Sequence, residues 1–239
     1  MNPAAEAQVV EDVQGDGRWM SLHKRFLLEA KEREPEVVFI GDSLIAQLQH
    51  MPIWQQMFEP LHCLNFGVGA ADQTQHVLWR VHNGELDNME PKVVVMLVGT
   101  NNHGHTGEQV VGGILEIVSA IQAKQPQCQV VVMGIPPRGE NPNILREKIL
   151  QINTSLAEQL KDKGNVTFLN IDASWFVSAD GKITHHDMHD YLHMTRRGYQ
   201  KICEPLLEEI QNLLQTFVKV ESTSVETVSM AGELAGDKA

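Results

Sequence analysis

Five short apolar runs, four of them rich in β-branched residues, recur along this 239-residue chain, and amphipathic segments with helical spacing separate them. The most apolar run, at 92–98, lacks polar alternation, which is typical of a strand covered on both faces. Strands that alternate with helices in this way favour a parallel sheet with helices on both sides. The expected strands are 37–40, 61–66, 92–98, 129–133 and 166–171. The sequence therefore predicts an α/β fold, a three-layer α/β/α sandwich around a parallel five-stranded sheet.

The domain organisation follows from length and from the composition of the two ends. No internal period suggests repeats, and the length fits a single domain, which we place at residues 17–218. The last helix of this domain is expected at about 196–218. The flanking segments 1–16 and 219–239 are acidic and lack sustained periodicity, so both are interpreted as mobile tails.

Composition excludes several classes of function. The net charge of −12 makes nucleic acid an improbable partner, and no apolar run approaches the ~20 residues of a membrane span. The first residues show neither the basic nor the apolar region of a signal peptide. Cys63, Cys128 and Cys203 are few and widely spaced, which argues against a disulfide framework. We therefore expect a cytoplasmic protein without a membrane span.

A candidate nucleophile follows the first expected strand. The β-branched run 37–40 ends in Gly41-Asp42-Ser43, and an amphipathic pattern begins at once. Ser43 is thus expected at the start of a helix, where free backbone N–H groups and the helix dipole favour a developing oxyanion. The alternative interpretation is that Ser43 only caps the helix.

A histidine-rich segment after the fifth expected strand supplies the candidate base. His193 is the candidate, and Asp190, three residues earlier, is placed to accept from the imidazole Nδ1–H. The same segment offers His185, His189 and His193 at intervals of four, a pattern that would ligate zinc on one helical face. A zinc hydrolase is therefore the rival enzyme, although the turn residues of this segment favour a loop and hence the serine mechanism.

Donors for an oxyanion are expected at two further strand ends. The candidates are the backbone N–H of Ser43, a backbone N–H of the glycine-rich turn between Gly69 and Ala71, and the side-chain amide of Asn101. Because the carboxyl ends of parallel strands share one edge of a sheet, these groups are expected to meet.

Four sequence blocks together resemble those of the GDSL, or SGNH, hydrolases. They are Gly41-Asp42-Ser43-Leu44, the glycine-rich block near Gly69, Gly99-Thr100-Asn101 and Asp190-Tyr191-Leu192-His193. Longer runs, at 76–80 and 98–103, are similar to the catalytic α subunits of type IB platelet-activating factor acetylhydrolases. The resemblance implies a flavodoxin-like fold and a serine esterase that removes the sn-2 acetyl group of platelet-activating factor-like phospholipids. It implies no metal and no cofactor.

The same resemblance implies further site residues and partners. Leu44, Thr100 and Leu192 are expected to shape a small acyl pocket, since branched side chains leave little room beyond acetyl. The expected assembly is a homodimer, or a heterodimer with a second catalytic α subunit, bound by the WD40-repeat lissencephaly protein as regulatory subunit. No nucleic acid is expected in it.

One departure from the family pattern lies in the glycine-rich turn. Ala70 and Ala71 stand where the family has its second glycine, and alanine adopts positive φ less readily than glycine. The donor geometry is therefore in question, and reduced turnover is expected. A catalytically silent subunit that only binds its partners is the alternative from another class of function.

Overall fold

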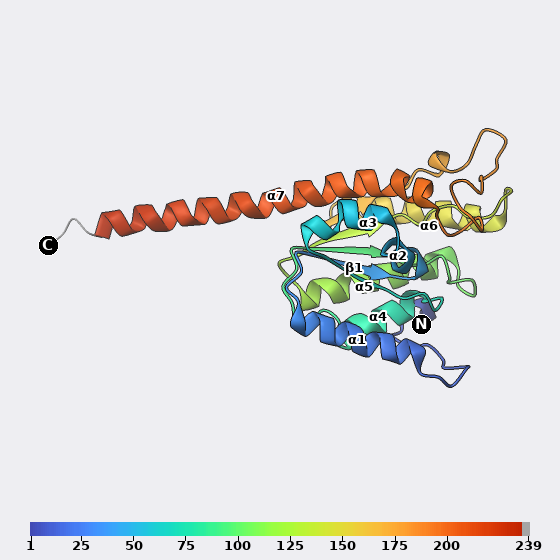
Figure 1. The fold of residues 1–239 in the computed structure, drawn as a ribbon, viewed down its shortest axis with the longest axis horizontal. Helices are drawn as coiled ribbons and strands as arrows, with labels where there is room; N and C mark the ends of the chain where they lie inside the picture. The colour runs from blue at the N-terminus through green and yellow to red at the C-terminus, as the bar shows by residue number, and fades with distance from the viewer. Residues whose placement is uncertain (236–239) are drawn as a thin grey trace.

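A computed structural model describes the backbone of residues 1–235 and the side chains of residues 1–220. Figure 1 shows a central sheet flanked by helices, with one long helix reaching away from the body. The strands are β1 (Val37–Gly41), β2 (Cys63–Gly67), β3 (Val93–Leu97), β4 (Gln129–Met133) and β5 (Val166–Leu169). The α-helices are α1 (Arg18–Glu32), α2 (Ser43–Leu48), α3 (Pro52–Met57), α4 (Thr74–His82), α5 (Gly107–Lys124), α6 (Ile144–Leu160) and α7 (Arg196–Ala235). Short 3₁₀ helices lie at η1 (Pro3–Ala5), η2 (Glu59–Leu61) and η3 (Ala173–Trp175).

The five strands form one parallel sheet in the order β2-β1-β3-β4-β5. Parallel neighbours need crossover connections, and the helices between successive strands supply them. The three-layer α/β/α fold predicted from the alternating pattern is thus confirmed. All carboxyl ends of the strands lie at one edge, so the loops that follow β1, β2 and β3 come together.

Alternate residues of each strand enter two separate cores. Val38 and Ile40 of β1 pack in the cluster that includes buried residues of α1, α4, α5 and α6. Val37 and Phe39 point to the opposite face and join the buried residues of α2, α3 and α7. Every residue of β1 and β3 is buried, because helices cover both faces of the central strands.

The chain ends differ from the expected tails. Helix α7 continues to Ala235 instead of ending near 218, and it also passes through Pro205 without interruption. The expected tail at 219–239 otherwise falls largely outside the described side chains. At the other end, Ala4 of η1 is fully buried and its carbonyl accepts a hydrogen bond from Thr74 Oγ1. The N-terminal segment around η1 therefore packs against the domain and is not a free tail.

No helix in the described part of the chain combines the length and the apolar character needed to cross a bilayer.

Candidate active site

Ser43 begins α2 directly after β1, at the turn that Gly41 makes possible. A Cβ at Gly41 would lie 2.2 Å from the carbonyl oxygen of Leu97, so β1 and β3 approach too closely for any other residue. The N-cap of α2 is Asp42, whose Oδ1 accepts a hydrogen bond from the backbone N–H of Leu44 at 2.9 Å. Because Asp42 takes the capping role, the hydroxyl of Ser43 is available for another partner.

That partner is the imidazole of His193. Ser43 Oγ lies 2.9 Å from His193 Nε2, and His193 Nδ1 lies 2.6 Å from Asp190 Oδ2. Asp190 Oδ1 also accepts from the backbone N–H groups of His193 and Leu192. Ser43 thus forms one continuous hydrogen-bonded row with His193 and Asp190, which lie about 150 residues later in the sequence. The arrangement is that of a nucleophile, a base and an orienting carboxylate.

The electrostatics of the row keep Asp190 ionised. Partial burial raises the pKa of this carboxyl, but the hydrogen bonds from the side chain and backbone of His193 and from Leu192 outweigh it and lower the pKa to about 2. The side chain of Ser43 is nearly buried, whereas those of His193 and Asp190 retain 19% and 45% of their exposure. An ester approaching from solvent therefore meets the hydroxyl beside an imidazole held by an anionic carboxylate.

The other polar groups predicted for the site lie on the loops after β2 and β3. Asn101 Nδ2 donates to the backbone oxygen of Asp72 at 3.1 Å, so one amide hydrogen is used and the second stays available for a ligand. Gly69 and Ala71 are exposed, and Ala71 adopts φ +58°. The alanine that replaces glycine in this turn thus sits in the left-handed conformation that glycine tolerates best.

The residues predicted for the acyl pocket are buried or half-buried. Leu44 is enclosed in the core between the sheet and α7, and its backbone oxygen accepts from Tyr199 Oη at 2.6 Å. Thr100 is nearly buried, and Arg138 donates to both its backbone and its hydroxyl oxygen. Leu192 is half-buried beside His193.

The histidine-rich segment does not form the helix that a zinc site with spacing of four requires. Residues 184–194 consist of turns and bridges, and His185, His186 and His189 are exposed. Within the described residues no group of three or more His, Cys, Asp or Glu side chains is placed to hold a metal ion. The helical premise of the zinc alternative is therefore wrong.

Sequence reasoning missed a buried charge beneath the candidate site. Arg80 of α4 is fully buried, and its guanidinium contacts Asp72 and Glu85. Burial raises the pKa of the Asp72 carboxyl to about 6, against the opposing effect of Arg80. The available signal was the position of Arg80, three residues after Val77 on the apolar face of a predicted helix.

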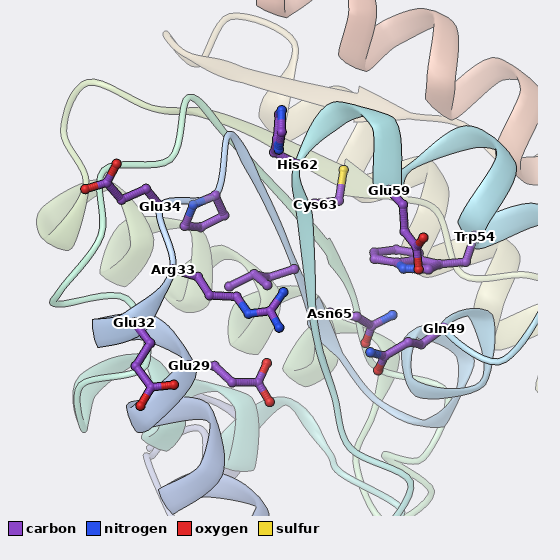
Figure 2. Close-up of a pocket in the computed structure, with 12 residues that line it drawn as sticks. Glu29, Glu32, Arg33, Glu34, Gln49, Trp54, Glu59, His62, Cys63 and Asn65 are labelled. Atoms are coloured by element: carbon purple, nitrogen blue, oxygen red, sulfur yellow. The ribbon is translucent and has the colours of Figure 1, made fainter.

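A pocket beside the amino end of the edge strand β2 is separate from this site. Figure 2 shows its lining, which comes from the end of α1 and the residues just after it, from α3 and η2, and from the start of β2. It includes the carboxylates of Glu29, Glu32, Glu34 and Glu59. None of the candidate catalytic residues lines it, because they follow the carboxyl ends of the strands.

Fold and site together define a hydrolase with a serine at a strand–helix junction, and comparison with known proteins agrees. Residues 39–201 match the GDSL-like lipase/acylhydrolase family, so the chain belongs to that family of carboxylic ester hydrolases. It is 54% identical over 213 residues to platelet-activating factor acetylhydrolase IB subunit alpha1 of Homo sapiens, covering 89% of this chain and 91% of that protein. It is 51% identical over 224 residues to subunit alpha2 of Rattus norvegicus, covering 94% and 97%.

A solved structure supports the same fold. A GDSL-like lipase from Bacteroides thetaiotaomicron superposes with a TM-score of 0.64 at 18% identity, covering 78% of this chain and 97% of that one. At this identity the likeness concerns the fold alone. The predicted family and fold class are confirmed.

Proposed function

We propose that this chain is a serine esterase that removes the sn-2 acetyl group of platelet-activating factor-like phospholipids. The observation that carries the serine mechanism is the hydrogen-bonded row from Ser43 Oγ through His193 to Asp190. The substrate class is supported by the names of the relatives that are more than half identical over most of the chain.

In the proposed mechanism Ser43 Oγ attacks the ester carbonyl while His193 Nε2 accepts its proton. The protonated imidazole then gives the proton to the departing alcohol oxygen, which leaves an acetylated Ser43. A water molecule, deprotonated by the same imidazole, releases acetate and restores the serine. Asp190 remains ionised throughout and holds the Nδ1–H, which fixes the tautomer that leaves Nε2 free.

The tetrahedral oxyanion is proposed to accept from the backbone N–H of Ser43, from a backbone N–H of Gly69 or Ala71, and from Asn101 Nδ2. The position of Ser43 at the first turn of α2 supports the first donor, because N–H groups there lack partners within the helix. The bond from Asn101 to the loop that ends at Asp72 supports the others, since it ties these two loops together.

The small acyl group is proposed to lie against Leu44, Thr100 and Leu192. Two of these side chains are buried and the third is half-buried, next to nucleophile and base. Short-chain esters are therefore the expected substrates, and each additional methylene is expected to cost activity.

We propose further that the chain works as a subunit of a larger cytoplasmic assembly. The relatives are named as alpha subunits, which supports a homodimer or a heterodimer with a second catalytic α subunit. The WD40-repeat lissencephaly protein is the proposed regulatory partner. Free thiols at Cys63, Cys128 and Cys203 fit a reducing compartment. Light scattering of the purified chain, alone and mixed with each partner, tests the assembly.

The decisive experiment compares the wild type with Ser43→Ala in hydrolysis of a short-chain acetyl ester, with and without chelator. We expect kcat to fall by at least ~10³-fold in the variant, and the kcat of the wild type to be the same with and without chelator. Activity that survives the mutation would contradict the serine mechanism.

The second candidate is a catalytically silent binding subunit, favoured by the left-handed conformation of Ala71 in the glycine-rich turn. A fluorophosphonate probe separates the two functions. An active subunit is labelled at Ser43, and a silent one is not.

A further inference from the structure

A buried cation joins two of the loops that form the candidate active site. Arg80 Nη2 donates to the backbone oxygen of Gly41 at 2.9 Å, and Nη1 donates to the backbone oxygen of Phe66 at 2.8 Å. Gly41 is two residues before Ser43, and Phe66 lies at the end of β2, just before the glycine-rich turn. One guanidinium therefore connects the strand that carries the nucleophile to the strand that leads into the oxyanion loop.

The same guanidinium also reaches the far end of that loop. Arg80 Nε lies 3.1 Å from Asp72 Oδ2, an ion-pair contact without hydrogen-bond geometry, and Trp19 Nε1 donates to Asp72 Oδ1 at 2.7 Å. The backbone oxygen of Asp72 accepts from Asn101. The loop between Phe66 and Asp72 is thus anchored at both ends, and its second anchor extends to the third proposed donor.

Glu85 completes the compensation of the buried charges. Its Oε2 lies 3.0 Å from Arg80 Nη1, and its Oε1 lies 2.8 Å from His23 Nδ1. Arg80, Asp72 and Glu85 are all fully buried, so each charge depends on these contacts in place of water. A buried ion cluster of this kind is often no more stabilising than apolar side chains of the same volume. What it supplies is geometry, because the planar guanidinium fixes several acceptors in one plane.

We propose that Arg80 is a positioning residue that sets the oxyanion donors relative to Ser43. Donors accelerate ester hydrolysis only when they are already aimed at the place where the negative charge develops. Misplacement by about 1 Å is enough to cost ~10²-fold in rate. Arg80 touches no reacting atom and acts through Gly41, Phe66 and Asp72. The inference rests on the proposed serine esterase function and adds a residue to it.

The test is Arg80→Lys, measured by steady-state hydrolysis of an acetyl ester. Lysine keeps the positive charge but cannot reach two carbonyl oxygens and two carboxylates together. The oxyanion develops only as the tetrahedral intermediate forms and is absent from the bound ester. We therefore expect kcat to fall by ~10–100-fold while KM stays within about twofold. Hydrogen exchange at the amides of 69–71 is expected to accelerate in the same variant.

The matched control is Leu156→Ala, which removes a fully buried side chain from α6 on the same face of the sheet. It lowers stability through a cavity, and its helix packs against α5 and β5, away from the loops after β1 and β2. We expect the kcat of Leu156→Ala to stay close to that of the wild type. If Arg80→Lys loses no more kcat than the control does, or if KM rises in step with the loss, the proposal is overturned.

A second variant covers the case in which Arg80→Lys does not fold. Glu85→Gln preserves size and removes the charge that holds Nη1, and we expect a ~3–10-fold fall in kcat with unchanged KM. An unchanged kcat in Glu85→Gln would overturn the proposal. Ser43→Ala is assayed in parallel, because activity that survives there refutes the serine esterase function itself, whatever Arg80 does.

Discussion

The carboxyl group of Asp42 caps α2 at the junction with β1, but one of its two oxygens is buried without a hydrogen bond from the described part of the chain. Its Oδ1 caps α2 through Leu44, whereas Oδ2 is buried and has no hydrogen-bond partner among the described residues. Burial raises the pKa of this carboxyl to about 7, against the opposing effect of the hydrogen bond from the Leu44 N–H. The folded protein therefore holds a proton on Asp42 that the unfolded chain releases near pH 4.

This shift gives a prediction for stability against pH. Since the folded state binds the extra proton between about pH 4 and 7, stability is lost as pH rises through that window. Asp42→Asn keeps the capping oxygen and cannot ionise. At each pH we compare the unfolding free energy of this variant with that of the wild type by urea denaturation. We expect the variant's advantage over the wild type to be on the order of 2 kcal/mol larger at pH 8 than at pH 5.

Asp172→Asn is the control, because Asp172 also caps a short helix but is exposed, and hydrogen bonds from Ser174 lower its pKa. The Asp172→Asn variant is expected to show no increase in unfolding free energy over the wild type at pH 8. An Asp42→Asn effect that is equal at both pH values contradicts the assignment of the buried charge.

The left-handed conformation of Ala71 strains the glycine-rich turn. A left-handed alanine costs about 1–2 kcal/mol relative to the right-handed form, and glycine avoids that cost. We expect Ala71→Gly to raise the unfolding free energy by about 1 kcal/mol and to raise kcat, measured by urea denaturation and ester hydrolysis.

Ala70→Gly is the matched control, because the φ of Ala70 is not positive and glycine there only adds disorder to the unfolded chain. It is expected to lose stability. If kcat in Ala71→Gly equals that of the wild type, the turn is not a strained oxyanion donor.

At the scale of elements, the contact between β2 and α2 determines where Ser43 lies. A Cβ at Gly67 would stand 2.2 Å from the backbone nitrogen of Ala46, so the end of β2 touches the helix that Ser43 begins. We expect Gly67→Ala to cost about 1–3 kcal/mol in stability and to lower kcat, because α2 must move. Thermal denaturation and kcat are the measurements.

Gly164→Ala is the control for stability, since nothing lies within 4 Å of a Cβ at that position. It is expected to leave the melting temperature nearly unchanged. A Gly67→Ala variant as stable and active as the wild type would contradict the close approach of β2 and α2.

The elements were predictable from the sequence wherever a single local signal dominated. The short apolar runs located all five strands to within two or three residues. The row of Ser43, His193 and Asp190 was predictable because loops that follow parallel strands share an edge. The cluster around Arg80 was not, because the role of a charge on an apolar helix face depends on its partners. For Arg80 these are the carbonyl oxygens at the ends of β1 and β2 and the carboxylates of Asp72 and Glu85, which the sequence pattern does not bring together.

At the scale of the whole molecule, α7 extends far beyond the body (Figure 1). A helix of 40 residues is ~60 Å long, whereas its fully buried side chains, among those described, end at Ile210. We expect deletion of residues 221–239 to shift the melting temperature by no more than about 2 °C. Deletion from Cys203 onward removes Leu206 and Ile210 from the core and is expected to prevent folding. A large shift in the shorter deletion would contradict this division of the helix.

The hydrogen bond between Ser43 and His193 joins positions 150 residues apart. Tyr199 of α7, which follows His193 in the chain, also donates a hydrogen bond to the backbone oxygen of Leu44, next to the serine. During synthesis the serine therefore leaves the ribosome long before its base exists. A nascent chain carries the nucleophile without the means to activate it, and a ribosome stalled before this histidine emerges holds an inert product. Reactivity toward esters is thus confined to chains whose translation has passed His193.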